Sequence, residues 1–398
     1  MAGICYVAPD IAIPSPRGAS THILELAAAL AKLGDEVHIV SKRLAGQKPV
    51  EEIRNVTLHR MYRWPGGVVP ASEGWGTRGN DSRSVGFESL GYRLYLQTFN
   101  AARAGFFAAR IIRGFSLGAV LERETAFGAG AFASVITGRP LLLEVIGPRS
   151  SPFSLSRCFK LLAYSSLMVP NEFRSRTEYV EAGVNTEIFK ADGESRRKLR
   201  EKLGLGDGIV VGYVGTFQTF HGVSDLLKAV ELASRRRNDL KVLLVGPYSQ
   251  SAVKLAADLR ISSKVIFVGP VGYEDVPSYI NASDIMVAPY NTVGTDRAVH
   301  GIGSPLKVLE YMATGKPTIG SSLPQLTTIL QDGITGRLFP EGDFKRLAEI
   351  ILELADSPVE RERLGKKGSS MVNEKYVWST LASRINDLIL EHSRHTRE

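Results

Sequence analysis

Residues 303–317, GSPLKVLEYMATGKP, combine a predicted helix start with one cation and one carboxylate. Ser304 suits the N-cap, and Pro305 suits the first helical position because its missing amide is not needed there. The first turn of such a helix directs its dipole and unpaired amides toward a bound anion. Lys307 adds charge at this end, and Glu310 adds an acceptor for a pair of sugar hydroxyls. Taken alone, the segment is better interpreted as a capped helix with a solvated lysine and a surface glutamate.

Two other loops have the same setting between a predicted strand and a predicted helix. The loop at 10–20 contains Gly18, which permits close backbone approach, and Ser20 or Thr21 can cap the next helix. The loop at 215–222 follows the first strand of the second half. Ligands of open α/β sheets bind at the carboxyl ends of strands. The three loops are therefore predicted to line one cleft if two domains face each other.

Short apolar runs alternate with helix-period segments along the whole chain, which predicts parallel sheets covered by helices. We therefore expect an α/β protein of two doubly wound, Rossmann-like domains, 1–188 and 189–375, and a final segment 376–398. Strands are predicted at 4–8, 37–40, 56–61, 119–122, 141–145 and 167–169, and then at 209–214, 242–245, 265–268, 285–288 and 318–319.

Helix boundaries follow from stop signals and periodicity. The first helix is predicted from about Thr21 to Gly34, and Gly315 is predicted to end the helix that follows Ser304. Residues 64–91 have no regular period, which indicates a functional or disordered loop that would help to choose the acceptor. Residues 92–115 carry aromatic residues and four arginines in a helical pattern. This helix packs on its own domain or, as a second interpretation, faces a membrane or an acceptor.

Composition indicates a soluble, cytoplasmic protein. The 398 residues are 44% hydrophobic and 23% charged, and no apolar run approaches the length of a bilayer span. Asp10 and Pro14 interrupt the first apolar segment, so we expect no secretory signal. Cys5 and Cys158 lie far apart in apolar contexts, which fits a reducing compartment and offers no metal-ligand spacing.

The net charge of +8 raises the question of an anionic partner. Basic clusters lie at 196–198, 235–237 and 394–397, and each one taken alone is better interpreted as a solvated helix face. The functional alternative is attraction to anionic lipid, as peripheral membrane contact, or to a phosphorylated substrate. No aromatic-basic platform or zinc-finger spacing accompanies the charge, so we expect no nucleic-acid partner.

The chain lacks the motifs of several enzyme classes. It has no G-x-G-x-x-G or Walker loop, no G-x-S-x-G nucleophile elbow, and no cluster of His and acidic residues at zinc spacing. Helix starts, basic side chains and one carboxylate suited to ribose remain. This set suits a nucleoside diphosphate that leaves as an anion.

The sequence resembles the retaining glycosyltransferases of family 4. The resemblance is strongest from Val211 to Asp343, and 303–317 matches the family's SPLK-x-x-E-Y-M-A-x-G-x-P variant. Residues 331–340 match its DG-x-x-G-x-L-x-x-P segment, and 271–290 match the stretch that contacts the nucleotide base. The family implies the GT-B fold, with two domains facing across a cleft and a C-terminal helix, here 376–398, that crosses back to the N-terminal domain. It also implies transfer of a sugar from a UDP- or GDP-sugar to an acceptor hydroxyl, with retained configuration.

The resemblance also implies roles for individual residues. Glu310 would bind the ribose, and the amides of Ser304 to Lys307 and of Gly215 to Thr216 would hold the pyrophosphate. The predicted donor-binding set is Gly18, Gly215, Thr216, Phe217, Gly246, Val271, Ser304, Pro305, Leu306, Lys307 and Glu310.

Three departures from the family pattern affect the donor side. Ile302 stands where many members have a glutamate that serves the transferred sugar. Phe217 and His221 stand where many members have arginine and lysine. His221 either replaces part of that charge, since a nearby phosphate favours the charged imidazole, or is a packing residue. Lys307 and His221 are the predicted catalytic groups on this side.

The N-terminal domain offers Arg123 and Glu144 as catalytic candidates on the acceptor or sugar side, in segments that a related subgroup shares. A structural salt bridge is an equal alternative for both residues, and His22 is better interpreted as a packing residue. We expect no metal or cofactor, because helix starts and side-chain cations already supply positive charge. The expected partners are a nucleotide sugar and a sugar, lipid-linked or small-molecule acceptor. A degenerate homologue that only binds nucleotide sugar, a GT-B-like epimerase and a phosphorylase remain alternatives.

Overall fold

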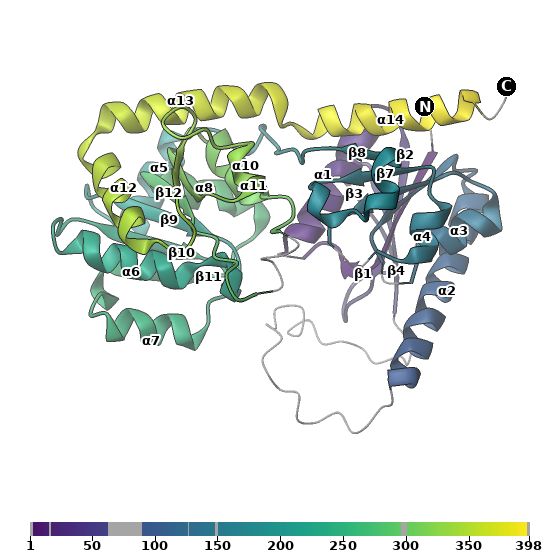
Figure 1. Ribbon diagram of the computed structural model, residues 1–398, viewed down its shortest axis with the longest axis horizontal. Helices are drawn as coiled ribbons and strands as arrows, with labels where there is room; N and C mark the ends of the chain where they lie inside the picture. Colours follow the sequence, from purple (N-terminus) through teal and green to yellow (C-terminus); the bar gives the residue numbers. More distant parts are fainter. Residues whose placement is uncertain are drawn as a thin grey trace. The chain divides into compact units, whose positions relative to one another are not determined.

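The computed structural model describes residues 3–15, 17–62, 90–125, 127–147, 150–295 and 301–395. The chain divides into two compact units (Figure 1). Unit 1 contains Met1–Glu181 and Trp378–Glu398, and unit 2 contains Ala182–Val377. The sequence placed these boundaries at 188 and 375. Of the predicted loop at 64–91, all but the last two residues lie outside the described residues.

Unit 1 is built on an eight-stranded sheet with the order β3-β4-β2-β1-β5-β6-β7-β8. Neighbouring strands are parallel, except for the antiparallel pair β3 and β4. The strands are β1 (Gly3–Ala12), β2 (Glu36–Lys42), β3 (Val50–Ile53), β4 (Val56–Met61), β5 (Ala119–Arg123), β6 (Leu141–Val145), β7 (Lys160–Ala163) and β8 (Thr177–Tyr179).

One predicted strand of unit 1 is wrong. Ser166–Met168 forms a short 3-10 helix instead of the strand predicted at 167–169. The Ser165 hydroxyl accepts a hydrogen bond from the Leu167 amide (3.2 Å), and this local bond competes with a strand ladder. Strands β3, β7 and β8, of three or four residues each, have no counterpart among the predicted strands.

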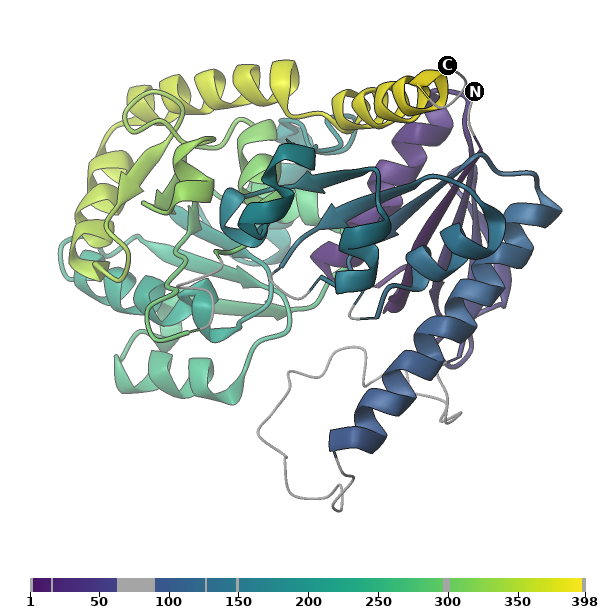
Figure 2. The same cartoon turned by 45° about the vertical axis from the view of Figure 1, so that its right-hand side comes forward.

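Helices cover both faces of the unit 1 sheet. Helices α1 (Gly18–Lys32) and α14 (Trp378–His395) pack against each other, and α2 (Leu90–Gly114) packs beside α3 (Ala129–Thr137), as Figure 2 shows. The short α4 (Pro152–Arg157) follows β6. Alternate β1 residues point to opposite faces, so Cys5 and Val7 enter the apolar core beneath α2 and α3.

The first helix begins earlier than predicted. Helix α1 starts at Gly18, with Arg17 at the N-cap position and no side-chain cap. The Ser20 hydroxyl accepts from the Ser15 amide (2.8 Å) and so serves the preceding loop. The prediction that Ser20 or Thr21 caps this helix is therefore wrong.

Unit 2 is built on a six-stranded, wholly parallel sheet with the order β11-β10-β9-β12-β13-β14. All five strands predicted for this half are present; β14 was not predicted because it has only three residues. The strands are β9 (Val210–Val214), β10 (Lys241–Val245), β11 (Val265–Gly269), β12 (Ile285–Ala288), β13 (Thr318–Ser321) and β14 (Arg337–Phe339). The helices are α5 (Gly193–Lys202), α6 (Val223–Ser234), α7 (Gln250–Asp258), α8 (Val276–Ala282), α10 (Leu306–Ala313), α11 (Pro324–Thr327), α12 (Phe344–Asp356) and α13 (Pro358–Lys375).

The strand orders locate the point in each sheet where a ligand is expected. In unit 1 the chain builds outward from β1 through β2, and later from β5 in the opposite direction. In unit 2 the same reversal occurs between β9 and β12. The loops that leave such neighbouring strands diverge and open a crevice at their carboxyl ends. Each unit therefore has one topological switch point, β1/β5 in unit 1 and β9/β12 in unit 2.

Candidate functional site

Three predicted donor segments meet at the switch point of unit 2. Gly215 follows β9, Gly246 follows β10, and Lys307 lies in the first turn of α10 after β12. A Cβ atom on Gly215 would lie 2.8 Å from the Lys307 Nζ, and one on Gly246 would lie 2.1 Å from the Gly215 carbonyl oxygen. Both glycines have positive φ, +149° and +130°. The fold thus brings two close-packed backbone turns beside one ammonium group.

Gly246 gives a direct test of this packing. We expect Gly246→Ala to destabilise unit 2 by roughly 1–3 kcal/mol, because the alanine would be strained at this φ and would press on the Gly215 carbonyl. Thermal unfolding of the purified protein measures the change. Gly193→Ala is the matched control, since its Cβ meets no atom within 4 Å. Equal unfolding temperatures for the two variants would contradict the close contact between Gly246 and the Gly215 carbonyl.

The Lys307 side chain lies between two aromatic rings. Its Nζ is 4.7 Å from the ring centre of Tyr213 and 4.9 Å from that of Tyr290, and it donates to the Tyr213 hydroxyl (3.2 Å). Burial lowers the pKa of Lys307 to about 7, although the nearby Glu310 carboxylate opposes the change. An anion placed here would favour the charged ammonium. Lys307 is therefore a half-buried, positioned cation and not the solvated lysine of the alternative interpretation.

Tyrosine hydroxyls fix the turn after β9. The Tyr213 hydroxyl donates to the Thr216 carbonyl (2.6 Å). The Tyr311 hydroxyl, on α10, accepts from the Val214 amide (2.7 Å) and donates to the Val214 carbonyl (2.9 Å). Burial raises the pKa of Tyr213 and of Tyr311 well above the ordinary value, so both remain neutral hydrogen-bonding groups. These tyrosines tie the 215–216 turn to α10.

His221 belongs to the same cluster. It lies in a single 3-10 turn, Thr219–His221, and its Nδ1 is 2.5 Å from the Thr216 carbonyl oxygen and 3.1 Å from the Thr216 hydroxyl. Its ring packs edge-on against Tyr290, with 5.5 Å between the ring centres. Lys307 and His221 therefore both contact Tyr290. Charge replacement and packing both stay open for His221.

The predicted cap of α10 is wrong. Helix α10 starts at Leu306 with Pro305 at the N-cap position, and the buried Ser304 hydroxyl oxygen has no hydrogen-bond partner among the described residues. The Leu306 amide donates to the Ser304 carbonyl (3.1 Å), and proline has no amide hydrogen. Of the predicted pyrophosphate-binding amides from Ser304 to Lys307, those of Pro305 and Leu306 are therefore excluded. Those of Ser304 and Lys307 remain as candidates. Gly315 ends the helix with φ +72°, as predicted.

The remaining predicted donor residues lie around this edge of unit 2. Phe217 follows the 215–216 turn and packs edge-on against Tyr213, with 5.6 Å between the ring centres. Val271 follows β11 and is partly buried against an apolar cluster that includes Leu243 and Val245. Glu310 lies one turn after Lys307 on α10 and is half-buried. The Glu310 carboxylate and the Lys307 ammonium therefore lie one helical turn apart at the switch point.

In unit 1, Glu144 on β6 is the centre of a buried polar network. Its carboxylate accepts from the hydroxyls of Tyr6 and Tyr164 (2.5 Å each) and from Arg123 Nη1 (3.2 Å). The His22 Nε2 lies 2.5 Å from Glu144 Oε1. Burial lowers the pKa of His22, so the neutral ring donates its N–H to this oxygen. Glu144 is fully buried, which favours the structural alternative over direct contact with a substrate.

The charge of Glu144 is stabilised by its partners. Burial alone would raise its pKa, but His22, Arg123 and the Tyr164 hydroxyl together hold the pKa of Glu144 well below its usual range. His22 also packs edge-on against Trp378 of α14, with 4.8 Å between the ring centres, which agrees with the packing role expected for it.

Arg123 differs from Glu144 because it also lines a cavity. A pocket of about 190 Å³ lies at the β1/β5 switch point of unit 1. The Glu124 carboxylate beside it accepts from the amides of Ile146 (2.7 Å) and Gly147 (2.6 Å). Gly18 starts the helix whose second residue, Ala19, reaches the same pocket. The lining residues are Ala8, Asp10, Ile11, Ala19, Arg123, Glu124, Thr125 and Ile146.

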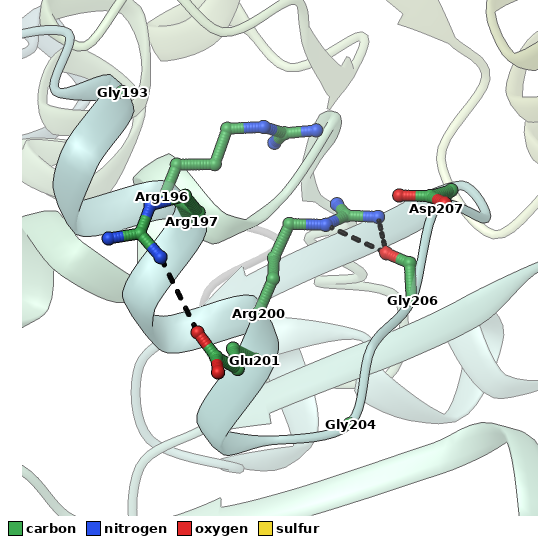
Figure 3. Close-up of a pocket in the computed structure, with 8 residues that line it drawn as sticks. All are labelled: Gly193, Arg196, Arg197, Arg200, Glu201, Gly204, Gly206 and Asp207. Atoms are coloured by element: carbon green, nitrogen blue, oxygen red, sulfur yellow. Dashed lines mark hydrogen bonds and ion pairs between the residues drawn. The ribbon is translucent and has the colours of Figure 1, made fainter.

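A second pocket, of about 490 Å³ on α5, contains none of the predicted site residues. Figure 3 shows Arg200 directed at the Gly206 carbonyl (2.7 Å) and Arg197 paired with Glu201 (3.5 Å). Arg196 and Arg200 also bind Asp284, whose carboxylate accepts from the Val210 amide (2.8 Å). Asp284 thus lies at the amino end of β12, opposite the switch point. Although Asp284 belongs to the stretch 271–290 that was predicted to contact the base, its role is therefore to link α5 to the sheet and not to contact a nucleotide.

Three general features were also searched among the described residues. No group of three or more His, Cys, Asp or Glu there could hold a metal ion, and no described helix is long and apolar enough to cross a membrane. Cys5 and Cys158 are unpaired and buried, and burial raises the pKa of Cys5 to about 12 and that of Cys158 to about 11. Neither thiol is an accessible nucleophile.

Comparison with known proteins finds a family similarity for part of the chain. Residues 195–371, which contain the entire β9/β12 site, match the family described as glycosyl transferases group 1. This match, over less than half of the chain, shows that the 195–371 segment is similar to the group 1 glycosyl transferases. The match lies within unit 2, and the turn, the lysine and the carboxylate described above all belong to this glycosyl transferase segment.

Two curated relatives and one solved structure are similar to the chain. A GDP-mannose-dependent α-(1-6)-phosphatidylinositol monomannoside mannosyltransferase of Mycolicibacterium smegmatis is 27% identical over 53% of this chain and 56% of its own. The chain thus spans little more than half the length of that relative. A phosphatidyl-myo-inositol mannosyltransferase of Mycobacterium leprae is 25% identical over 96% of this chain and 94% of its own. Sucrose-phosphate synthase of Thermosynechococcus elongatus has a TM-score of 0.75 at 18% identity over 99% and 100% of the two chains, a likeness of the GT-B fold.

Sequence reasoning missed the tyrosines of the glycosyl transferase segment. Tyr213 and Tyr290 flank Lys307, and Tyr311 holds the turn after β9. Tyr213 and Tyr311 lie in a strand and a helix whose patterns are typical of core residues, and Tyr290 was expected only as the end of the base-contacting stretch 271–290. Their positions gave a signal that could have been used. Tyr213 is the second-last residue of β9, and Tyr290 comes two residues after the end of β12, so both lie at the switch point. A tyrosine placed there keeps a hydroxyl available to the site.

Proposed function

We propose that this protein is a retaining glycosyltransferase that moves a sugar from a UDP- or GDP-sugar to an acceptor hydroxyl. The observation that carries the proposal is the position of the Lys307 ammonium, beside Gly215 and between two tyrosine rings at the β9/β12 switch point. Charge develops on the diphosphate as the glycosidic bond breaks, and a preorganised cation with fixed amides stabilises that charge. No metal would then be required for the leaving group.

The relatives suggest the kind of donor and acceptor to test first. The Mycolicibacterium relative is named for GDP-mannose and for a phosphatidylinositol mannoside acceptor. We therefore propose a GDP-sugar as the first donor, with a UDP-sugar as the second, in glycolipid or glycan synthesis. The Arg123 pocket in unit 1 has an arginine and two acidic residues among its lining, which suits hydroxyl groups of a polyol acceptor.

A nucleotide-release assay tests the activity. Purified protein is incubated with GDP-, UDP- and ADP-sugars and candidate acceptors, with and without EDTA, and free nucleotide and glycosylated product are measured. We expect acceptor-dependent release from one nucleotide class, unchanged by EDTA. Tight donor binding without turnover on any acceptor would instead support a degenerate partner subunit. Ile302, in the position of the family's sugar-binding glutamate, is the observation that favours this second candidate. An isomerised sugar nucleotide without transfer would identify an epimerase.

Glu310 tests the donor site separately from turnover. We expect Glu310→Gln to weaken binding of the nucleotide by roughly 10- to 100-fold, because a charge-assisted hydrogen bond to a ribose hydroxyl is worth about 1.5–3 kcal/mol. Calorimetric titration with the free nucleoside diphosphate measures the affinity. Glu349→Gln, on the exposed face of α12, is the control. Unchanged nucleotide affinity in Glu310→Gln would reject the ribose role.

A further inference from the structure

Helix α2 of unit 1 has two very different faces. Its inner face is buried in the core beneath the sheet and consists of small and aliphatic side chains. Its outer face leaves aromatic side chains in solvent: Phe106 is 61% exposed and Phe99 is 39% exposed. The inner residues are Ala101, Ala104, Ala108, Ile111 and Ile112. The prediction that this helix packs on its own domain therefore explains its inner face but not its exposed aromatic side chains.

The outer residues form a single stripe, which we call the basic aromatic face. Phe99, Arg103, Phe106, Arg110 and Arg113 recur at alternating intervals of four and three, the spacing of one helix face. The Arg103 side chain lies at the edge of this face: it is half-buried, its Nη1 is shielded from solvent, and its guanidinium lies 6.0 Å from the Phe99 ring centre. Arg110 is exposed, and Arg113 is exposed although it donates to the Ile136 carbonyl at the end of α3 (2.7 Å).

The charged side chains of the two helices have one sign. Neither α2 nor the adjoining α3 contains an aspartate or a glutamate, whereas α2 contains four arginines. Helix α3 extends the surface with Val135, which is 55% exposed, and Arg139 follows that helix. Large apolar side chains interleaved with arginines on a solvent-facing helix are the pattern of segments that lie in the headgroup layer of a membrane.

We propose that the basic aromatic face docks unit 1 on an anionic lipid surface. The exposed Arg110 and Arg113 would lie among phosphate headgroups, and Phe99 and Phe106 would enter the boundary of the acyl chains. The absence of acidic side chains from both helices favours anionic lipid over a neutral bilayer. This docking is independent of the reaction proposed above, because none of its residues belongs to either switch point.

Vesicle co-sedimentation tests the proposal with the whole 398-residue chain. The vesicles are phosphatidylcholine alone or phosphatidylcholine mixed with phosphatidylglycerol. We expect the wild type to bind only the mixed vesicles, and Arg110→Gln to weaken that binding about fivefold. The double variant Phe106→Ser/Arg110→Gln should lose roughly tenfold or more. The matched control is Val359→Ser/Arg235→Gln, which removes one exposed apolar residue and one exposed arginine from unit 2.

Each outcome decides the proposal. Selective loss in the face variants, with wild-type unfolding temperatures, supports it. Equal binding by the wild type and the double variant, wild-type binding to neither vesicle, or equal loss in the control would overturn it. Retention on immobilised RNA that depends on Arg110, without vesicle binding, would assign the face to a nucleic acid instead and also overturn it.

Discussion

Replacing Lys307 with methionine is expected to lower kcat/KM for the sugar nucleotide roughly 10²–10³-fold, the usual effect of removing one preorganised charge-stabilising group. Methionine keeps the volume between the Tyr213 and Tyr290 rings but removes the ammonium beside Gly215. Lys228→Met is the matched control, because Lys228 also lies over an aromatic ring, that of Phe344 (5.3 Å). Steady-state kinetics of both variants measures the difference.

The same lysine predicts how donor affinity depends on pH. Burial sets the pKa of Lys307 at about 7 in the free protein, and a bound diphosphate would raise it. Affinity should therefore be greatest below pH 7, where the ammonium is already charged, and should fall as the pH rises above 7. Titrations of nucleoside diphosphate across this range should show the fall in the wild type and in Lys228→Met, and a flatter profile in Lys307→Met. A profile unchanged by Lys307→Met would assign the titration to another group.

Replacing Glu144 with glutamine is expected to destabilise unit 1 by about 3–5 kcal/mol, the cost of leaving a buried charge without its partner. Arg123 would lose its carboxylate, and the new amide would face hydroxyl donors from Tyr6 or Tyr164. The contrasting control is Glu391→Gln on α14 of unit 1, because Glu391 pairs with Arg384 (3.2 Å) and both side chains are exposed, 54% and 36%. That change should cost under about 1 kcal/mol.

Tryptophan fluorescence during urea unfolding can follow unit 1, because Trp378 packs against His22 in that unit and the sequence of unit 2 has no tryptophan. The pKa of Glu144 lies below its ordinary value, so its stabilising effect is present at neutral pH and is lost as the pH falls below the ordinary range of glutamate. The difference between wild type and Glu144→Gln should shrink accordingly in acid. An unfolding midpoint that matches the wild type at pH 7 would contradict the network's structural role.

The extent of the sequence prediction can be read from particular elements. The strands Val56–Met61, Leu141–Val145 and Ile285–Ala288 have the bounds that the sequence indicates. Each is a short apolar run, and such a run predicts a buried strand from its own residues, whichever strands it later pairs with. Ser166–Met168 and the start of α10 were predicted wrongly. In each case hydrogen bonds of only a few residues, from Leu167 to Ser165 and from Leu306 to Ser304, decided the backbone path.

By itself, the sequence determined the α/β class, the two doubly wound units and the segment that carries Lys307 and Glu310, because apolar periodicity and helix stop signals are local properties. Only the tertiary structure decided what surrounds these groups. Tyr6 and Glu144 are 138 positions apart, and Tyr213 and Lys307 are 94 positions apart, yet each pair is joined by a hydrogen bond. Burial, the pKa of Lys307 and the satisfied charge of Glu144 all arise from such contacts, which exist only when strands from distant parts of the chain pair in one sheet.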